Sequence, residues 1–118
     1  MLLGHAMIPD GISFHDAVIA DIRCEGGKIA FMIEDVVVDD GEEVTPGVLT
    51  LEEVKNITVD GEAVPVLDMA GDDGEIADLQ VLDGPVVKIS VVWTQSDSPE
   101  ETHHTYTIAC RAVRWAED

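Results

Sequence analysis

The sequence predicts a mainly β protein: a single-domain antiparallel β-sandwich or flattened barrel of about seven strands, with little or no helix. Three observations favour this class. Residues 86–95 alternate apolar and polar side chains, as a half-buried strand does. Asp-Gly, Gly-Gly and Pro-Gly turn signals recur at short intervals, and no long stretch has helical periodicity. At 118 residues, the chain is expected to fold as one domain over residues 1–118.

The predicted centre of the sheet is a hairpin formed by residues 86–95 and residues 103–115. Each strand places a set of apolar side chains on one side: Val87, Ile89, Val91 and Trp93 in the first, and Tyr106, Ile108, Cys110 and Ala112 in the second. The connection, residues 96–101, is polar and contains Pro99. This composition predicts a hairpin loop slightly longer than the minimum.

The first third of the chain allows two interpretations. Ser13 and Asp16 have the spacing of a helix-capping pair. Residues 18–24 instead alternate in the manner of a strand, and Gly26-Gly27 joins them to residues 28–33 as a hairpin, which we favour. A change of phase near Glu34-Asp35 predicts a bulge. Residues 39–43 are expected to form an exposed, mobile acidic loop that ends at a turn over residues 45–47.

Residues 48–59 are expected to be strand on both sides of a break near Val54, with a helical turn over residues 51–56 as the alternative. Asp60-Gly61 predicts a tight turn into residues 63–69, which Pro65 restricts to a sheet edge. Turns are also expected over residues 72–74 and 83–85. They bound a predicted strand over residues 75–82.

Charge is the least ordinary property of the sequence. Six Lys and Arg stand against 25 Asp and Glu, which gives a formal net charge of −19. Nucleic acid and an anionic membrane surface are therefore excluded as partners, because both require a basic face. No apolar run approaches the roughly 20 residues of a membrane span. The acidity has two remaining interpretations: solubility or adaptation to salt, or a surface that meets a basic protein.

Two cysteines, Cys24 and Cys110, are too few for a disulfide framework and are expected to be small buried apolar residues. No secretory segment is recognised in residues 1–8, so a reduced, cytoplasmic protein is expected. The five aromatic residues are expected in the core, with an interface as the alternative for Trp115. Arg111 and Arg114 are expected to balance neighbouring carboxylates on the outer face, with an anion site as the alternative.

Motifs for catalysis or metal binding are incomplete. Ser13, His15 and Asp16 have the residue types of a hydrolase triad, but on a strand His15 and Asp16 would point to opposite faces. His103 and His104 would need further ligands from elsewhere to bind a metal. Residues 68–75 fail the calcium-loop pattern at its third and sixth positions. No cofactor is expected.

The segment Phe14-His15-Asp16-Ala17, at the start of a β-meander, resembles the start of small uncharacterised bacterial β domains. Some of these domains look like immunity proteins of polymorphic toxin systems. The resemblance implies a rigid protein that binds a toxin domain, often a basic one, through an acidic surface. It implies no particular site residues.

The leading hypothesis is a non-enzymatic acidic binding module that engages a basic protein partner, with an immunity-like role as its more specific form. The residues predicted to bind the partner are the carboxylates of two acidic segments: Asp39, Asp40, Glu42, Glu43, Asp72, Asp73 and Glu75. One alternative is a small hydrolase or metal-dependent enzyme that uses His15, His103 or His104. Another is a structural domain that self-associates through a sheet edge. The sequence leaves the oligomeric state open.

Overall fold

The structure, a computed structural model, describes residues 5–7, 11–38, 41 and 43–117. These residues contain no α-helix, and therefore none that is long and apolar enough to cross a membrane. The mainly β class is therefore confirmed, but the described residues form ten strands and not the predicted number of about seven. The described residues form these strands: β1 (His5–Met7), β2 (Val18–Glu25), β3 (Lys28–Val38), β4 (Glu43–Glu52), β5 (Asn56–Val59), β6 (Glu62–Ala63), β7 (Asp73–Leu82), β8 (Val86–Gln95), β9 (Ser98–Ala109) and β10 (Ala112–Glu117).

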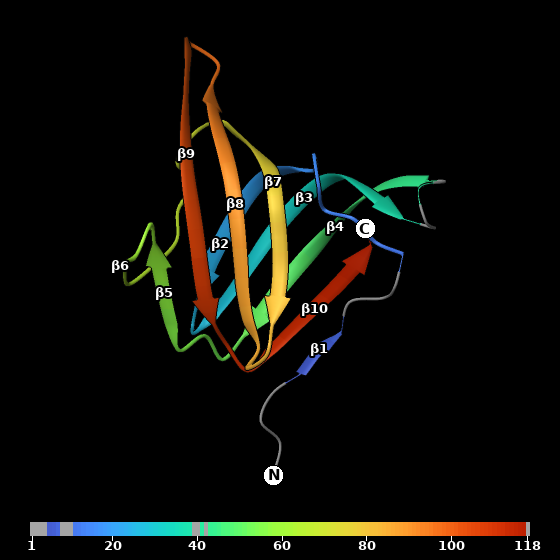
Figure 1. The fold of residues 1–118 in the computed structure, drawn as a ribbon, viewed down its shortest axis with the longest axis vertical. Coiled ribbons are helices and arrows are strands. Elements are labelled where there is room, and N and C mark those ends of the chain that lie inside the picture. The colour runs from blue at the N-terminus through green and yellow to red at the C-terminus, as the bar shows by residue number, and fades with distance from the viewer. Residues whose placement is uncertain (1–4, 8–10, 39–40, 42, 118) are drawn as a thin grey trace.

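The strands form one sheet in the order β1-β10-β4-β3-β2-β7-β8-β9-β5-β6. All neighbours are antiparallel except β1 and β10, which are parallel. Figure 1 shows that the sheet folds over itself, with β7, β8 and β9 in front of β2, β3, β4 and β10. The fold occurs between β2 and β7, whose pairing is limited to Val18 with Glu75 and Ile19 with Gly74.

The hydrophobic core fills the space between the two layers. The inward side chains of β8, from Val87 to Trp93, are buried as their alternation predicts. They meet inward side chains of β3 and β4, such as Phe31 and Leu49, within one cluster. The expectation that the aromatic residues lie in the core is also confirmed, because all five are buried: Phe14, Phe31, Trp93, Tyr106 and Trp115.

The central hairpin is found, but its second strand is not continuous. β9 ends at Ala109, and Cys110 and Arg111 lead the chain into β10, which pairs with β4 in the other layer. The Cys110 N–H donates to the Pro85 carbonyl, and the Arg111 N–H donates to the Glu52 carbonyl. The predicted loop over residues 96–101 is also too long. Gln95 pairs with Ser98, so that two residues make the turn.

The first hairpin agrees with the strand interpretation of residues 18–33. Gly26 and Gly27 have φ angles of +58° and +78°, the left-handed conformation that a two-residue hairpin turn requires. The predicted bulge is confirmed by the register shift between Ile33 and Val36. A second bulge, between Ile19 and Asp21, was not predicted. It exposes the residue between them and makes the predicted alternation of residues 18–24 wrong.

Two predicted turns are wrong because their glycines serve close packing instead. Gly47 lies within β4, where a Cβ would collide with the ring of Trp115 and would lie 2.6 Å from the Ala116 carbonyl oxygen. Gly74 lies within β7, where a Cβ would meet the ring of Trp93 at 2.7 Å. Glycine at these positions therefore lets a strand approach a tryptophan.

Between β4 and β7, the predicted break near Val54 and the predicted turn at Asp60-Gly61 are both confirmed. The chain leaves β4 at Glu52 and resumes as β5 at Asn56, with no helical turn between them. The predicted edge run over residues 63–69 is found only at its start: β6, only two residues long, is an edge strand of the sheet, and residues 64–69 are not in a strand. Of the predicted acidic loop over residues 39–43, Asp39, Asp40 and Glu42 lie outside the described residues.

Candidate functional site

An acidic pocket of about 290 Å³ lies at the end of the molecule where β7 begins and β8 ends. This feature is called the acidic pocket below. Its lining residues are Val18, Glu34, Asp35, Asp73, Glu75, Val92, Thr94 and Glu101. Its five carboxylates come from β3, β7 and β9. Its two valines, one on β2 and one on β8, supply the apolar part of the lining.

Strand register places these side chains together. One row of cross-strand neighbours runs from Glu34 through Val18 and Glu75 to Val92. A second, adjacent row contains Asp73, Thr94 and Glu101. Neighbours in such rows project from the same face of a sheet. Because Val91 and Trp93 point into the core, both rows face outward.

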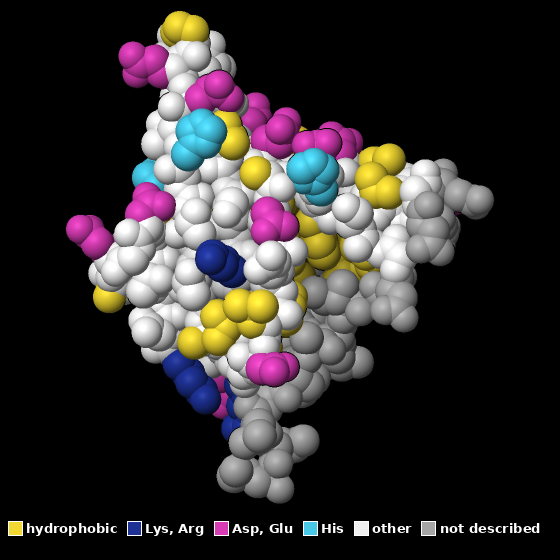
Figure 2. Space-filling model, viewed as in Figure 1, with side chains coloured by type: hydrophobic (Ala, Val, Ile, Leu, Met, Phe, Trp, Pro, Cys, Tyr) yellow, Lys and Arg dark blue, Asp and Glu magenta, His cyan; other side chains and the backbone are white. Residues whose placement is uncertain are grey.

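The Lys and Arg side chains lie outside the acidic pocket. None of them lines the acidic pocket, and they lie in strands and turns of the half of the fold away from it: Arg23, Lys28, Lys55, Lys88, Arg111 and Arg114. Figure 2 shows one face, on which Asp and Glu gather in a row near the top, with others at the left edge, the centre and the bottom, and on which Lys and Arg lie at the centre and the lower left. Among the described residues, no carboxylate of the acidic pocket forms an ion pair with Lys or Arg.

The ion pairs of Arg111 and Arg114 confirm one expectation from the sequence. Arg111 Nε lies 3.5 Å from a Glu53 oxygen, and Arg114 Nε lies 2.9 Å from a Glu52 oxygen. The arginines thus balance neighbouring carboxylates on the outside of the fold. The carboxylates of the acidic pocket, by contrast, have no such cationic partner among the described residues.

The predicted partner-binding residues do not all converge. Asp73 and Glu75 line the acidic pocket. Asp72 instead accepts hydrogen bonds from the backbone N–H and the hydroxyl of Ser96, the first at 2.7 Å, and so holds the β8–β9 turn. Glu43 begins β4, opposite Val38, and does not line the acidic pocket. The prediction missed Glu34, Asp35 and Glu101, whose positions depend on strand register.

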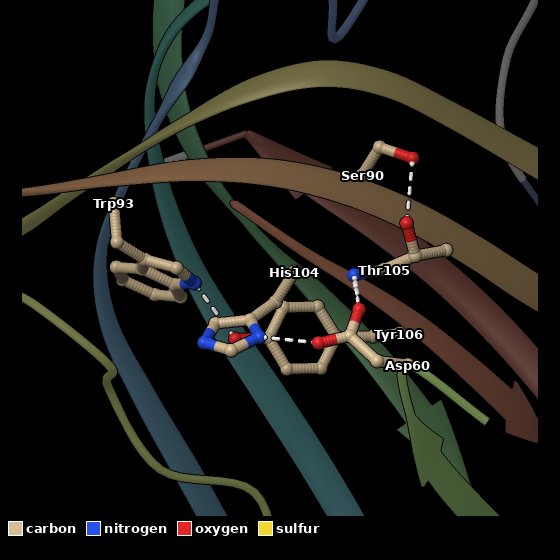
Figure 3. A network of polar contacts seen from close by, with 6 residues as sticks. All are labelled: Asp60, Ser90, Trp93, His104, Thr105 and Tyr106. Atoms are coloured by element: carbon tan, nitrogen blue, oxygen red, sulfur yellow. Dashed lines mark hydrogen bonds and ion pairs between the residues drawn. The ribbon is translucent and has the colours of Figure 1, made fainter. Parts of the chain in front are cut away.

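A polar network fastens β9 to the end of β5 (Figure 3). The His104 Nδ1 lies 2.6 Å from one oxygen of Asp60, and the Thr105 backbone N–H donates to the other oxygen at 2.8 Å. Deeper in the fold, the Trp93 indole N–H donates to the Tyr106 hydroxyl at 2.7 Å. The network therefore joins β9 to Asp60, the residue directly after the last pair of the β5–β9 ladder, Val59 with Tyr106.

Hydrogen bonds shift the pKa values of two exposed carboxyl groups, those of Asp60 and Asp72, and titration can measure these shifts. The hydrogen bond with His104, followed by that from the Thr105 N–H, lowers the pKa of Asp60 below its ordinary value. Hydrogen bonds from Ser96 lower the pKa of Asp72 in the same way. A carboxyl group whose pKa is lowered by folding stabilises the folded protein, and this stabilisation is complete at pH values above the unfolded-state pKa. That stability is lost as the pH falls through the folded-state pKa.

We therefore expect carboxyl NMR titration to give pKa values for Asp60 and Asp72 below the ordinary 3.8. In a His104→Ala variant, the pKa of Asp60 is expected to rise while the pKa of Asp72 stays where it was. Asp72 is the internal control because its partner is Ser96. An unchanged pKa of Asp60 in this variant would contradict the assigned role of His104.

The histidines named in the enzymatic alternative make separate contacts. The prediction that His15 and Asp16 diverge is wrong: they lie in a turn, Asp16 has a φ of +68°, and His15 Nε2 lies 3.6 Å from an Asp16 oxygen. His15 Nδ1 donates to the Ala77 carbonyl at 2.7 Å. Ser13 Oγ accepts a bond from the His15 backbone N–H, at 3.4 Å, and no contact joins Ser13 to the imidazole. The ring is therefore not placed as a general base for Ser13.

The other two histidines lie next to each other on β9 and serve different faces. His103 is the cross-strand neighbour of Val92, at the end of the first row of the acidic pocket. His104 bonds Asp60, as described above. Among the described residues, no three His, Cys, Asp or Glu side chains are grouped so as to hold a metal ion.

Other parts of the described surface are less concentrated in charge. A pocket of about 480 Å³ at the β2–β3 hairpin is lined by Arg23, Glu25, Gly26, Lys28 and Ala30, a mixed set. Both cysteines are free, with Cys110 buried and Cys24 half-buried. The acidic pocket thus has the chemistry of a cation acceptor: carboxylates to receive N–H donors, and valines to contact an aliphatic stem. No family model, curated protein or solved structure was found to match the chain.

Proposed function

We propose that this protein is a non-enzymatic binding module that engages a basic protein partner through the acidic pocket. One observation carries the proposal: five carboxylates line a single pocket that no Lys or Arg lines, and none of these carboxylates has a Lys or Arg partner among the described residues. Scattered surface acidity, as solubility alone requires, does not demand this separation. A concentrated negative field attracts and orients a basic partner.

The lining of the acidic pocket fits the side chain of lysine or arginine. Either side chain combines a cationic head with an aliphatic stem. The head would meet Glu34, Glu75 or another of the carboxylates, and the stem would lie along Val18 and Val92. Arginine adds the possibility of paired hydrogen bonds to one carboxylate, which makes the contact directional.

An immunity-type role is the more specific form of this proposal. The resemblance of Phe14-His15-Asp16-Ala17 to domains of that type suggests a basic toxin domain as the partner. Such a protein would act by covering its partner and would need no chemistry of its own. The exposed acidic pocket on a sheet with a well-packed core suits that task.

Neutralising the acidic pocket is expected to weaken binding of a lysine-rich peptide. The variant Glu34→Gln, Glu75→Gln, Glu101→Gln removes three of its charges with little change of shape. We expect its affinity for deca-lysine, measured by calorimetry at about 50 mM salt, to fall by roughly tenfold or more. The difference from the unmodified protein should shrink at about 0.5 M salt, because salt screens exposed charges.

The matched control carries the same number of charge changes outside the acidic pocket: Glu25→Gln, Glu62→Gln, Glu117→Gln, all at exposed positions. It is expected to retain most of the affinity. Equal losses in the two triple variants would show that the peptide senses net charge only. If, in addition, the thermal stability of both rises steeply with salt, the acidity is a salt adaptation and the proposal fails.

A further inference from the structure

β9 has an exposed edge that no other strand covers within the described part of the chain. It pairs with β8 along most of its length, but with β5 only from Tyr106 to Ala109. Figure 1 shows β9 continuing past the end of β5 toward the β8–β9 tip, with no strand on that side. We call residues 98–104 the β9 edge. Residues 99–103 are exposed to solvent.

The hydrogen bonds of Thr105 fix the direction of the backbone groups along this edge. Its N–H donates to the Asp60 carboxylate, and its carbonyl accepts from the Asp60 N–H, both at 2.8 Å. Both groups therefore point away from β8. Register with β8 is unbroken from Ala109 to Glu101, so alternation gives His103 and Glu101 the same direction. Two N–H groups and two carbonyls are thus presented to an incoming strand.

A second copy of the chain is a poor occupant of the β9 edge. Antiparallel pairing of two such edges would bring Glu100 and Glu101 of both copies together, and each copy has a net charge of −19. Pro99 further limits the length of such a pairing. The same carboxylates favour a segment of opposite charge, which makes a basic, extended segment the complementary occupant.

The β9 edge is also continuous with the acidic pocket. Glu101 belongs to both, and the two rows of the pocket end on β9 at Glu101 and His103. A strand added beside β9 would extend these rows by one position. Its outward side chains, if lysine or arginine, would lie next to Glu101.

We propose that the basic partner docks by adding an extended segment to the β9 edge as a further strand of the sheet, with its Lys or Arg side chains beside Glu101. Main-chain hydrogen bonds would supply the pairing, and the acidic side chains would select the charge. The inference rests on the proposed function for the charge of the partner. The mode of docking rests on the geometry of β9.

The test uses the full chain, labelled with ¹⁵N, and a peptide of alternating lysine and threonine about eight residues long, the length of an ordinary strand. Amide hydrogen exchange is followed by NMR with and without the peptide. The amides of Glu101 and His103 are expected to exchange more slowly by about tenfold or more when the peptide is bound. The amide of Thr105, already bonded to Asp60, is expected to change little and serves as the internal reference.

Two substitutions at one position separate the backbone from the side chain. His103→Pro removes the outward N–H without removing a bond to β8, whereas His103→Thr keeps the N–H and removes the imidazole. Peptide affinity is expected to fall about tenfold in the proline variant and to stay near the original in the threonine variant. Spectra of the free variants show whether each remains folded. The exchange measurement on the unmodified chain stands even if the proline variant does not fold.

The outcomes distinguish the two proposals. Binding that protects Glu101 and His103 and is lost with His103→Pro supports docking as an added strand. Binding that perturbs the acidic pocket but leaves both amides unprotected overturns strand addition and leaves the proposed function in place. No salt-sensitive binding of this peptide or of deca-lysine overturns both.

Discussion

Replacing Trp93 with alanine is expected to lower the free energy of unfolding by about 3–5 kcal/mol, the loss typical of a large buried aromatic residue. Trp93 is 1% exposed and belongs to the hydrophobic core cluster. Its ring meets that of Tyr106 edge-on, with centroids 6.4 Å apart, and its N–H bonds the Tyr106 hydroxyl. Alanine would leave a cavity and remove the donor to a buried hydroxyl. Urea unfolding followed by far-ultraviolet circular dichroism gives the value without relying on tryptophan fluorescence.

Tyr106→Phe is the matched control, because it keeps the ring and removes only the hydroxyl. It leaves the Trp93 N–H buried without its acceptor, at an expected cost of about 1–3 kcal/mol. The difference between the two variants measures the packing of the indole ring. If Trp93→Ala costs no more than Tyr106→Phe, the ring is not the centre of the core that its burial indicates.

The second large effect is expected at Gly74, where the space for a side chain is already filled. An alanine Cβ would lie 2.7 and 2.8 Å from two ring carbons of Trp93 and 2.8 Å from a methyl carbon of Val91. Contacts this short force the strand or the ring to move, and Gly74→Ala should cost about 1–3 kcal/mol. The same urea titration measures it. Because Asp73 and Glu75 flank Gly74, the movement should also weaken binding at the acidic pocket.

A double-mutant cycle identifies the neighbour responsible. In a Trp93→Ala background the ring is absent, so Gly74→Ala is expected to cost less by about 1 kcal/mol or more. The remaining cost reports the contact with Val91. Equal costs in the two backgrounds would rule out the ring of Trp93 as the obstacle.

Local patterns predicted the strands that have one buried face. The alternation of Val87, Ile89 and Val91 located β8 with its correct bounds, and Gly26-Gly27 located the first hairpin. The break at Cys110 was missed because apolar alternation continues through it. Only the hydrogen-bonding partner changes there, from β8 to β4, and that partner is distant in sequence.

The acidic pocket was only partly predictable for the same physical reason. Asp73 and Glu75 attracted notice because they stand in an acidic run. Glu34 and Glu101 come from strands far from that run, and they reach the acidic pocket through the register of β3 with β2 and of β8 with β9. Register depends on pairing between distant segments. Gly74 likewise has the local signature of a turn, and its actual role depends on Trp93.

The carboxylates of the acidic pocket have no cationic neighbours, whereas the Lys and Arg side chains lie elsewhere on the fold, so this polyanion has an electric dipole in addition to its net charge. Net charge determines how strongly a positively charged body attracts the molecule, whereas the dipole determines which way the molecule faces when it arrives. In such a field the molecule rotates until its negative end leads, so that the acidic pocket and the β9 edge meet the partner first. A larger fraction of encounters then has the orientation that binding requires, which raises the association rate constant before any specific contact forms.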